Sequence, residues 1–225
     1  MPTILIATRN AHKVSEIRAI LGKNFQIYTL NDFPAAPKVI EDADTFAGNA
    51  TKKSIELANW LCTTRHPSLS TYDSFVLADD SGLEVDALDG APGVHSARFA
   101  ALDSHENSAD ADNNAKLLRL LKNVPTGKLT ARFRCVIALT PVADKIESAS
   151  PVCYAEEPQT QLFDGACDGQ IILEAHGKNG FGYDPLFKPD GFTATFAELG
   201  DDVKNKISHR AKALEKLKAF FHASQ

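Results

Sequence analysis

Residues 3–21 read TILIATRNAHKVSEIRAIL, and this stretch decides the fold class of the chain. The apolar run at 3–7 predicts a buried strand, and residues 11–21 repeat apolar side chains at the spacing of a helix that Gly22 can end. The short polar segment 8–10 separates the two. A strand that passes so directly into a helix is typical of α/β proteins, and we expect one here.

The rest of the chain continues this mixture of strands and helices. Residues 129–140 alternate apolar and polar side chains, which predicts a long half-buried strand. Some predicted strands follow one another as in hairpins and others are separated by helices, so a mixed central sheet is favoured over a purely parallel one. We expect a single domain over residues 1–225. Further strands are predicted at about 25–29, 75–78, 145–155 and 169–174; the second of these breaks at Asp79 and resumes at 83–85. Helices are predicted at about 46–61, 108–121 and from Ser208 onward. A Gly/Pro loop is predicted at 89–98 and a Gly-rich loop at 176–189.

The net charge argues against two classes of partner. The formal net charge of −5 argues against a broad surface for nucleic acid or for an anionic membrane. It leaves room for a small phosphorylated ligand, which meets only a few local lysines and arginines. The four cysteines form no C-x-x-C pair, and neither a signal peptide nor an apolar segment of membrane length is evident, so we expect a reduced, cytoplasmic protein.

The polar turn after the first predicted strand is a candidate phosphate site. Such a turn presents free backbone N–H groups and the positive end of the helix dipole, to which Thr8 and Asn10 add neutral donors and Lys13 a charge. An ordinary N-cap followed by a solvated lysine would look the same. Lys53, inside a predicted helix, and Arg98, at the end of a loop, are further candidate phosphate contacts that the local sequence leaves open.

Acidic residues form a candidate metal site. Asp79 and Asp80 follow an apolar run, and Glu41 precedes the second predicted helix. Mg²⁺ usually takes one or two protein carboxylates, with waters and phosphate oxygens completing its shell, and a bound metal can lower the pKa of an attacking water. The alternative is a turn or helix cap made by acidic side chains.

Two segments near the C-terminus are candidates for binding a base. The glycines of residues 180–185 would let a flat ligand approach, with Phe181 stacking on it and Asp184 accepting a hydrogen bond from its edge. Residues 204–210 place consecutive donors at a predicted helix N-terminus, where carbonyl oxygens or anions are favoured. An ordinary glycine turn and an ordinary helix start remain the alternatives.

The order in which these motifs follow one another along the chain identifies a protein family more specifically than any single motif does. Together they resemble the inosine/xanthosine triphosphate pyrophosphatase family, which acts on non-standard purine nucleotides, along essentially the whole chain. The resemblance implies an α/β fold with a mixed central sheet and two lobes around a substrate cleft, usually in a homodimer. The matching blocks are Thr8-x-Asn10-x-x-Lys13, Glu41, Thr45-Phe46-x-x-Asn49-Ala50-x-x-Lys53, Ala78-Asp79-Asp80-Ser81-Gly82-Leu83, Gly90-Ala91-Pro92-Gly93 with Ser96-Ala97-Arg98, Phe181-Gly182-Tyr183-Asp184-Pro185 and Lys204-x-x-x-Ser208-His209-Arg210.

The resemblance also implies a reaction and a role for each site residue. The family uses Mg²⁺ to hydrolyse the bond between the α- and β-phosphates of ITP, dITP and XTP, giving the nucleoside monophosphate and pyrophosphate, and so keeps such bases out of DNA and RNA. By motif position, Glu41 and Asp80 would bind the metal, and Asp80 would also be the general base for the attacking water. The remaining implied contacts are Thr8, Asn10, Lys13 and Lys53 to the triphosphate, Ser81 to the substrate, and Phe181, Gly182, Tyr183, Asp184, Lys204, His209 and Arg210 to the base.

One position departs from the family pattern. Many bacterial members carry Glu two residues after the Phe of the Thr-Phe pair, where this chain has Gly48. If that Glu assists metal binding, this protein relies more on Glu41 and the aspartates.

Three other classes of protein fit the sequence less well. Asp42-Ala43-Asp44-Thr45 matches the D-x-D-x-T of aspartate-nucleophile phosphatases, but the preceding residues 36–41 make a poor strand. A P-loop ATPase or kinase would need G-x-x-x-x-G-K-[ST], which the sequence lacks. A non-catalytic nucleotide-binding module would gain little from carboxylates placed beside phosphates.

Overall fold

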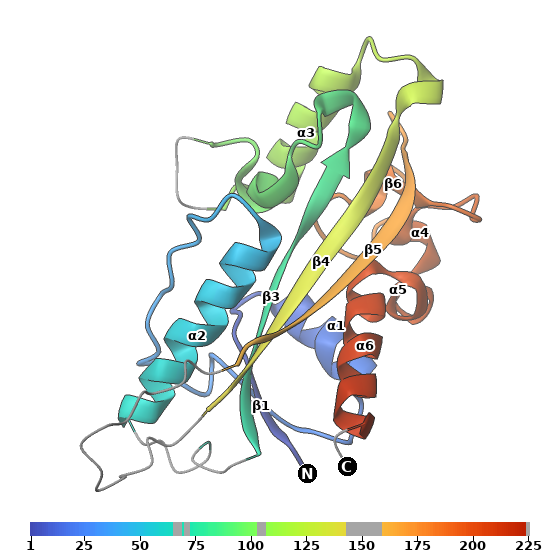
Figure 1. The fold of residues 1–225 in the computed structure, drawn as a ribbon. Coiled ribbons are helices and arrows are strands. Elements are labelled where there is room, and N and C mark those ends of the chain that lie inside the picture. Colours follow the sequence, from blue (N-terminus) through green and yellow to red (C-terminus); the bar gives the residue numbers. More distant parts are fainter. Residues whose placement is uncertain (65–68, 70–72, 103–106, 143–158, 224–225) are drawn as a thin grey trace, which may run out of the picture. The chain divides into compact units, whose positions relative to one another are not determined.

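The computed structural model describes residues 1–64, 69, 73–102, 107–142 and 159–223 (Figure 1). The chain divides into two compact units, one of residues 1–80 with 136–163 and the other of residues 81–135 with 164–225. Three of the strands, β3, β4 and β5, contribute residues to both units.

The strands are hydrogen-bonded in the order β2-β1-β3-β4-β5-β6. Strand β1 pairs in parallel with β2 and β3, whereas β5 pairs antiparallel with β6, so the predicted mixed α/β architecture is confirmed. The strands are β1 (Thr3–Ile6), β2 (Gln26–Thr29), β3 (Ser74–Val85), β4 (Thr130–Pro141), β5 (Gln161–Ile171) and β6 (Phe187–Pro189). The α-helices are α1 (Ala11–Leu21), α2 (Phe46–Thr64), α3 (Asp110–Leu121), α4 (Phe196–Leu199), α5 (Asp201–Ile207) and α6 (His209–Ala223).

The first unit is built around β1. Because this strand is paired along both edges and covered on both faces, all of its residues are buried, which is why residues 3–7 read as a continuous apolar run. Leu57 and Leu61 of α2 belong to the same buried cluster as Leu5 of β1 and Val76 of β3. Helix α2 therefore covers one face of the parallel strands.

Polar groups fix both ends of α1. The Asn10 side chain accepts hydrogen bonds from the backbone N–H groups of His12 and Lys13 at 3.0 and 3.1 Å, so it is the N-cap. Gly22 follows the last turn with a left-handed φ of 70°, and its N–H donates to the Arg18 carbonyl at 3.0 Å. The predicted helix at 11–21 is confirmed.

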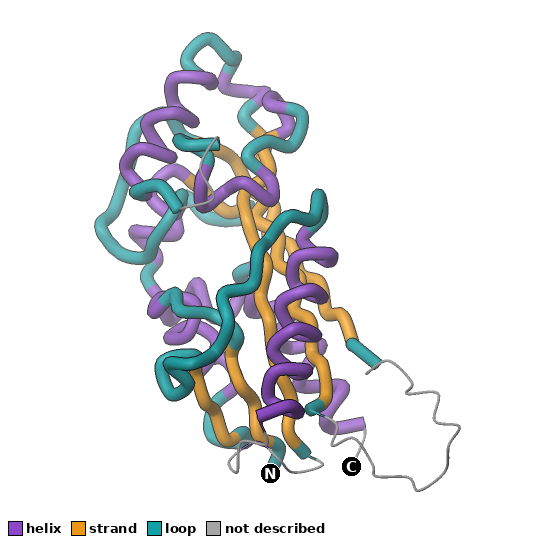
Figure 2. Tube along the Cα trace, turned by 90° about the vertical axis from the view of Figure 1, so that its left-hand side faces the viewer, coloured by secondary structure: helices purple, strands orange, loops and turns teal. Residues whose placement is uncertain are grey.

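A long loop, residues 30–45, connects β2 to α2 and runs alongside α2 (Figures 1 and 2). Leu30, Phe33 and Ala36 of the loop are buried in the cluster that contains Leu57 of α2. The loop is therefore anchored by apolar contacts, although it has no regular secondary structure.

The second unit has an aromatic core. The ring centre of Phe133, on β4, lies 4.8 Å from that of Phe187 and 6.0 Å from that of Phe196. His209, the first residue of α6, stacks on Phe133 with ring centres 4.9 Å apart and planes 13° apart. Leu117 of α3 joins the three phenylalanines in one buried cluster, so β4 connects the start of α6 to α3 and α4.

Strand β3 is longer than predicted. The sequence predicted a break at Asp79, but β3 runs without interruption through Asp79 and Asp80. The prediction was wrong because both carboxylates are buried beside cationic and amide partners, so they do not need a turn that exposes them to water. At Gly82, a Cβ would come within 2.5 Å of the carbonyl oxygen of Gly93, so close packing explains this glycine.

Other predicted boundaries need smaller corrections. The inner half of β4, residues 135–140, is buried on both faces rather than half-buried. Strand β5 begins at Gln161, well before the predicted start at 169, and the strand predicted at 145–155 lies outside the described residues. The predicted loops at 89–98 and 176–189 contain the 3₁₀ turns Gly93–Arg98 and Asp184–Leu186, and β6 also lies in the second.

The predicted helix start at Ser208 is confirmed. Ser208 separates α5 from α6, and its Oγ accepts a hydrogen bond from the N–H of Ala211 at 3.2 Å. Lys204 is not in that first turn, however, because it belongs to the separate short helix α5. In the described part of the chain, no helix combines the length and the apolar character needed to cross a bilayer.

Candidate active site

The turn between β1 and α1 holds three of the predicted phosphate contacts. The Thr8 hydroxyl accepts from the Asn10 N–H at 3.1 Å, while Asn10 caps the helix with its own side chain. Asn10 is therefore the N-cap of α1, as the alternative interpretation of this turn predicted. The Thr8 hydroxyl, the Asn10 amide nitrogen and the Lys13 ammonium are the side-chain donors that this turn can offer to an anion.

Lys13 is fixed by a buried aspartate. Its Nζ donates to Oδ1 of Asp79 at 2.5 Å, and the Asp79 side chain is 0% exposed. Asp79 and Asp80 are consecutive residues of a strand, so their side chains point to opposite faces of it. The first carboxylate accordingly meets α1 and the second meets α2.

Lys53, on α2, is the centre of the second cluster. Its Nζ donates to Oε2 of Glu41 at 2.9 Å and to the backbone carbonyl of Asp79 at 2.8 Å, and it lies 3.7 Å from Oδ1 of Asp80. Asn49, one helical turn earlier, donates from Nδ2 to Oδ2 of Asp80 at 3.2 Å. The structure thus brings together Glu41, Lys53 and Asp80, as predicted. It adds Asn49, to which the sequence had assigned no role.

Asp80 lies in an environment suited to a general base. Burial raises the pKa of its carboxyl to about 6, although Lys53 and Lys13 act to lower it. Such a group is mainly ionised at neutral pH, yet it accepts a proton more readily than an exposed aspartate does.

The donor set around Asp80 suits a hard divalent cation. Among the described residues, no group of three or more His, Cys, Asp or Glu side chains is arranged to hold a metal ion. Mg²⁺ commonly uses only one or two protein carboxylates, however, and the ammonium group of Lys53 lies between Glu41 and Asp80. Two carboxylates that already share one cation fit the chemistry of a Mg²⁺ site.

The space around Gly48 leaves little room for a further acidic side chain at this site. A Cβ at this position would meet the Cβ of Ala43 at 2.7 Å and Oγ1 of Thr45 at 3.0 Å. A side chain such as glutamate here would require the loop at Ala43 to move. In this chain the carboxylates beside Lys53 are those of Glu41 and Asp80.

The second unit contains a separate cluster of buried cations. Lys204 Nζ donates to Oδ2 of Asp184 at 2.5 Å, and both side chains are 2% exposed. The same ammonium group lies 4.6 Å from the ring centre of the half-buried Phe181. Asp184 Oδ2 also accepts from the Phe181 N–H at 2.9 Å, so this carboxylate supports the loop and the lysine together.

Arg210 completes this cluster. It is 0% exposed, its Nη2 donates to the Ser81 hydroxyl at 2.8 Å, and its guanidinium carbon lies 6.0 Å from the Phe181 ring centre. The structure therefore brings Ser81, Phe181, Lys204 and Arg210 together, with His209 at the start of the same helix as Arg210.

Arg98 has a local partner. Its Nη2 lies 3.3 Å from Nδ1 of His95, within the same 3₁₀ turn. A phosphate contact by Arg98 stays a prediction.

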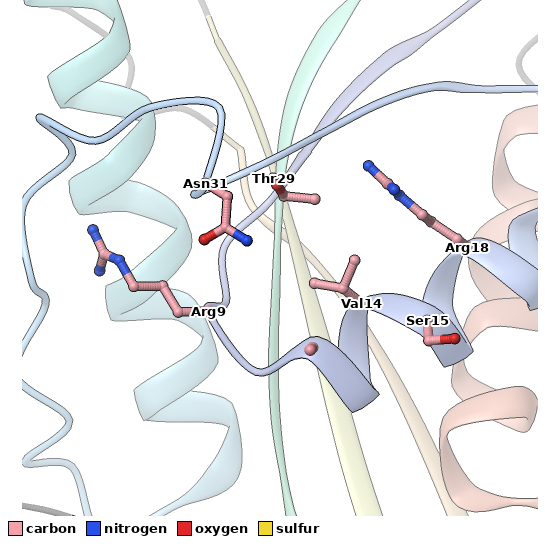
Figure 3. A pocket seen from close by; sticks show the side chains of 7 residues that line it. Arg9, Val14, Ser15, Arg18, Thr29 and Asn31 are labelled. Carbon is pink, nitrogen blue, oxygen red and sulfur yellow. The ribbon is translucent and has the colours of Figure 1, made fainter.

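A pocket of about 330 Å³ lies beside α1 (Figure 3). Arg9 and Arg18 stand on either side of Thr29 and Asn31 there, and Arg9 donates to the Ala36 carbonyl at 3.2 Å. None of the predicted site residues lines this pocket, and its lining is Arg9, Ala11, Val14, Ser15, Arg18, Thr29 and Asn31.

Comparison with known proteins gives the same family along nearly the whole chain. The model of the Ham1 family matches residues 4–220. A dITP/XTP pyrophosphatase of Desulforamulus reducens is 44% identical over 214 residues, covering 95% of this chain and 92% of the relative. Another dITP/XTP pyrophosphatase, of Geobacter sulfurreducens, is 45% identical over 219 residues, covering 97% and 96%.

A solved structure agrees with this assignment. The HAM1 protein from Coxiella burnetii superimposes with a TM-score of 0.78 at 33% identity, covering 99% of this chain and 100% of that one. The shared sequence and the shared fold extend over both units. The chain therefore belongs to the Ham1 family.

Proposed function

We propose that this protein hydrolyses ITP, dITP and XTP to the nucleoside monophosphate and pyrophosphate. The observation that carries the proposal is the buried Asp80 carboxylate, which Lys53 and Asn49 contact directly. The Ham1 relatives named dITP/XTP pyrophosphatases support the same reaction. Removal of such nucleotides would keep their bases out of DNA and RNA.

Asp80 is the proposed general base. Water adds across the bond between the α- and β-phosphates: its oxygen forms the new P–O bond, the bridging bond breaks, and the released proton passes to the Asp80 carboxylate. Lys13 and Lys53 bind the phosphate oxygens and stabilise the charge that develops on them. Asn49 keeps the carboxylate oriented through its bond to Oδ2.

We infer that Glu41 and Asp80 hold Mg²⁺. A bound ion would neutralise phosphate charge and lower the pKa of the attacking water. Support for this role comes from the Lys53 ammonium between the two carboxylates, which marks a place where positive charge is stabilised.

Base recognition is proposed for the cluster in the second unit. Phe181 offers a flat surface for the purine, and the donors of Lys204, His209 and Arg210 suit the carbonyl oxygen that hypoxanthine and xanthine carry at position 6. Asp184 supports this site indirectly, because its Oδ2 already accepts from Lys204 and from the Phe181 N–H. A homodimer and a cytoplasmic location complete the proposal, on the strength of the motif resemblance and the cysteine pattern.

The aspartate-phosphatase alternative has little structural support. It requires a strand that leads into Asp42, whereas the described segment 30–45 is a loop, and Asp42 pairs with Lys52 at 2.7 Å. Assays of pyrophosphate and of free phosphate release from ITP, dITP, XTP, GTP and ATP test the proposal. Pyrophosphate should appear from ITP, dITP and XTP. Free phosphate instead would indicate a phosphatase, and neither product would indicate a binding module.

A further inference from the structure

Two side chains of helix α3 form hydrogen bonds with the backbone of Gly182, a residue of the proposed base-binding loop. Oδ2 of Asp110 accepts a hydrogen bond from the Gly182 N–H at 2.7 Å, and Nδ2 of Asn114 donates to the Gly182 carbonyl at 3.0 Å. Asp110 and Asn114 are four residues apart on one helix, so their side chains lie on the same face. Both backbone polar groups of Gly182 are thus held by a single rigid element.

The flanking residues are held by other elements. Tyr183 donates from its hydroxyl to the Ser96 carbonyl at 2.9 Å, and the Phe181 N–H donates to Asp184, which is paired with Lys204 of α5. Gly182 itself has a φ of 62°, a left-handed conformation that glycine adopts without strain. The backbone next to the Phe181 ring is therefore fixed on both sides.

Asn114 is an unfavourable choice if its role is stability alone. Its Oδ1 is buried, and no described residue donates a hydrogen bond to it. A buried acceptor without a partner costs roughly 1–3 kcal/mol, so much of what this amide gains through its bond to the Gly182 carbonyl is offset at its other end. Retaining the amide makes sense if its other end, bonded to Gly182, serves function.

We propose that Asp110 and Asn114 are positioning residues that set purine selectivity by fixing Phe181 relative to Lys204 and Arg210. The inference rests on the proposed function, since it assumes that the base stacks on Phe181. The ring centre lies 4.6 Å from the Lys204 ammonium and 6.0 Å from the Arg210 guanidinium carbon. A shift of about 1 Å in such a site can cost on the order of 100-fold in rate.

Three variants test whether the hydrogen bonds from Asp110 and Asn114 to Gly182 set purine selectivity. Asp110→Ala removes the acceptor, and Asn114→Asp puts a carboxylate oxygen against the Gly182 carbonyl with almost no change of shape. Asp110→Asn keeps an acceptor oxygen and should rescue much of the loss. Asp112→Ala is the matched control, because Asp112 is an exposed acid in the same first turn. Melting temperature is measured for every variant.

For Asp110→Ala and Asn114→Asp we expect kcat/KM for ITP to fall about 10- to 100-fold, chiefly through KM, and the ratio of ITP to ATP efficiency to narrow. Inhibition by pyrophosphate, which lacks a base, should be unchanged. An unaltered ITP-to-ATP ratio in Asn114→Asp, or an equal change in Asp112→Ala, would overturn the inference. Failure of the proposed function would look different, because the wild-type protein would then release no pyrophosphate from ITP.

Discussion

Asn49 and Asp80 form a buried pair in which the amide Nδ2 donates to the carboxylate Oδ2 at 3.2 Å. A hydrogen bond to a carboxylate favours its charged form, whereas burial disfavours it. The hydrogen bond from Asn49 therefore holds Oδ2 of Asp80, while Oδ1 lies 3.7 Å from the Lys53 ammonium.

Replacement of Asp80 by Asn should abolish most turnover while leaving substrate binding largely intact. Loss of a general base alone is worth about 10²- to 10⁴-fold in rate, and loss of a proposed metal ligand adds to this. Turnover and KM for ITP are to be measured with and without Mg²⁺, and a chelator should stop the wild-type enzyme. Near-normal turnover in Asp80→Asn would show that another group accepts the proton.

Replacement of Lys13 or Lys53 by Ala should lower kcat/KM for every triphosphate alike, because phosphates carry no information about the base. A hydrogen bond to a charged group is worth about 1.5–3 kcal/mol, which corresponds to roughly 10- to 150-fold. Lys52→Ala is the control, since Lys52 precedes Lys53 but pairs with the exposed Asp42. A fall in kcat/KM for triphosphates of one base only would show that these lysines do not bind the phosphates.

Replacement of Arg210 by Ala should narrow the preference for ITP over ATP. Two donors left unpaired by the amino group of adenine, at about 1.4 kcal/mol each, predict at least about 100-fold selectivity in the wild-type protein. Efficiencies with ITP and ATP are compared at a temperature where both proteins are folded. If the ratio is unchanged, the base is recognised by other groups, and the loop at 180–184 is the first to test.

Replacement of Gly165 by Ala should destabilise the second unit. A Cβ there would come within 2.1 Å of the His209 carbonyl and 2.7 Å of the Ala213 nitrogen, so the backbone of α6 would have to move. Overpacking of this kind costs about 1–3 kcal/mol, or roughly 2–12 °C in Tm for a chain of this length. Gly127→Ala is the control, because a Cβ there meets no atom within 4 Å. Equal melting temperatures for the two variants would contradict the tight packing of β5 against α6.

The sequence correctly predicted those elements that depend only on residues close to one another along the chain. The helix at 11–21 and the cap at Ser208 were predicted correctly because periodicity and capping are properties of neighbouring residues. The break expected at Asp79 was wrong because its partner, Lys13, lies 66 residues away in sequence. A carboxylate whose counter-ion is distant cannot be distinguished by pattern from one that faces water.

The same limit applies to the candidate site. The motifs named Lys53 and Asp80, but no spacing rule shows that Asn49 contacts Asp80. Asp110 likewise reads as an ordinary acid in the first turn of a helix, where the dipole alone would explain it. Its bond to Gly182 joins segments 72 residues apart and becomes visible only when the fold is known.

The ion pairs of Lys13 with Asp79 and of Lys53 with Glu41 bear on how binding should respond to salt. Each lysine already has an anionic partner in the protein, so a polyphosphate that arrives exchanges or shares that partner and does not meet a bare charge. Added salt screens the pairs that are given up as well as those that are gained. Affinity for the triphosphate should therefore fall less steeply with ionic strength than it would for two lysines exposed to solvent.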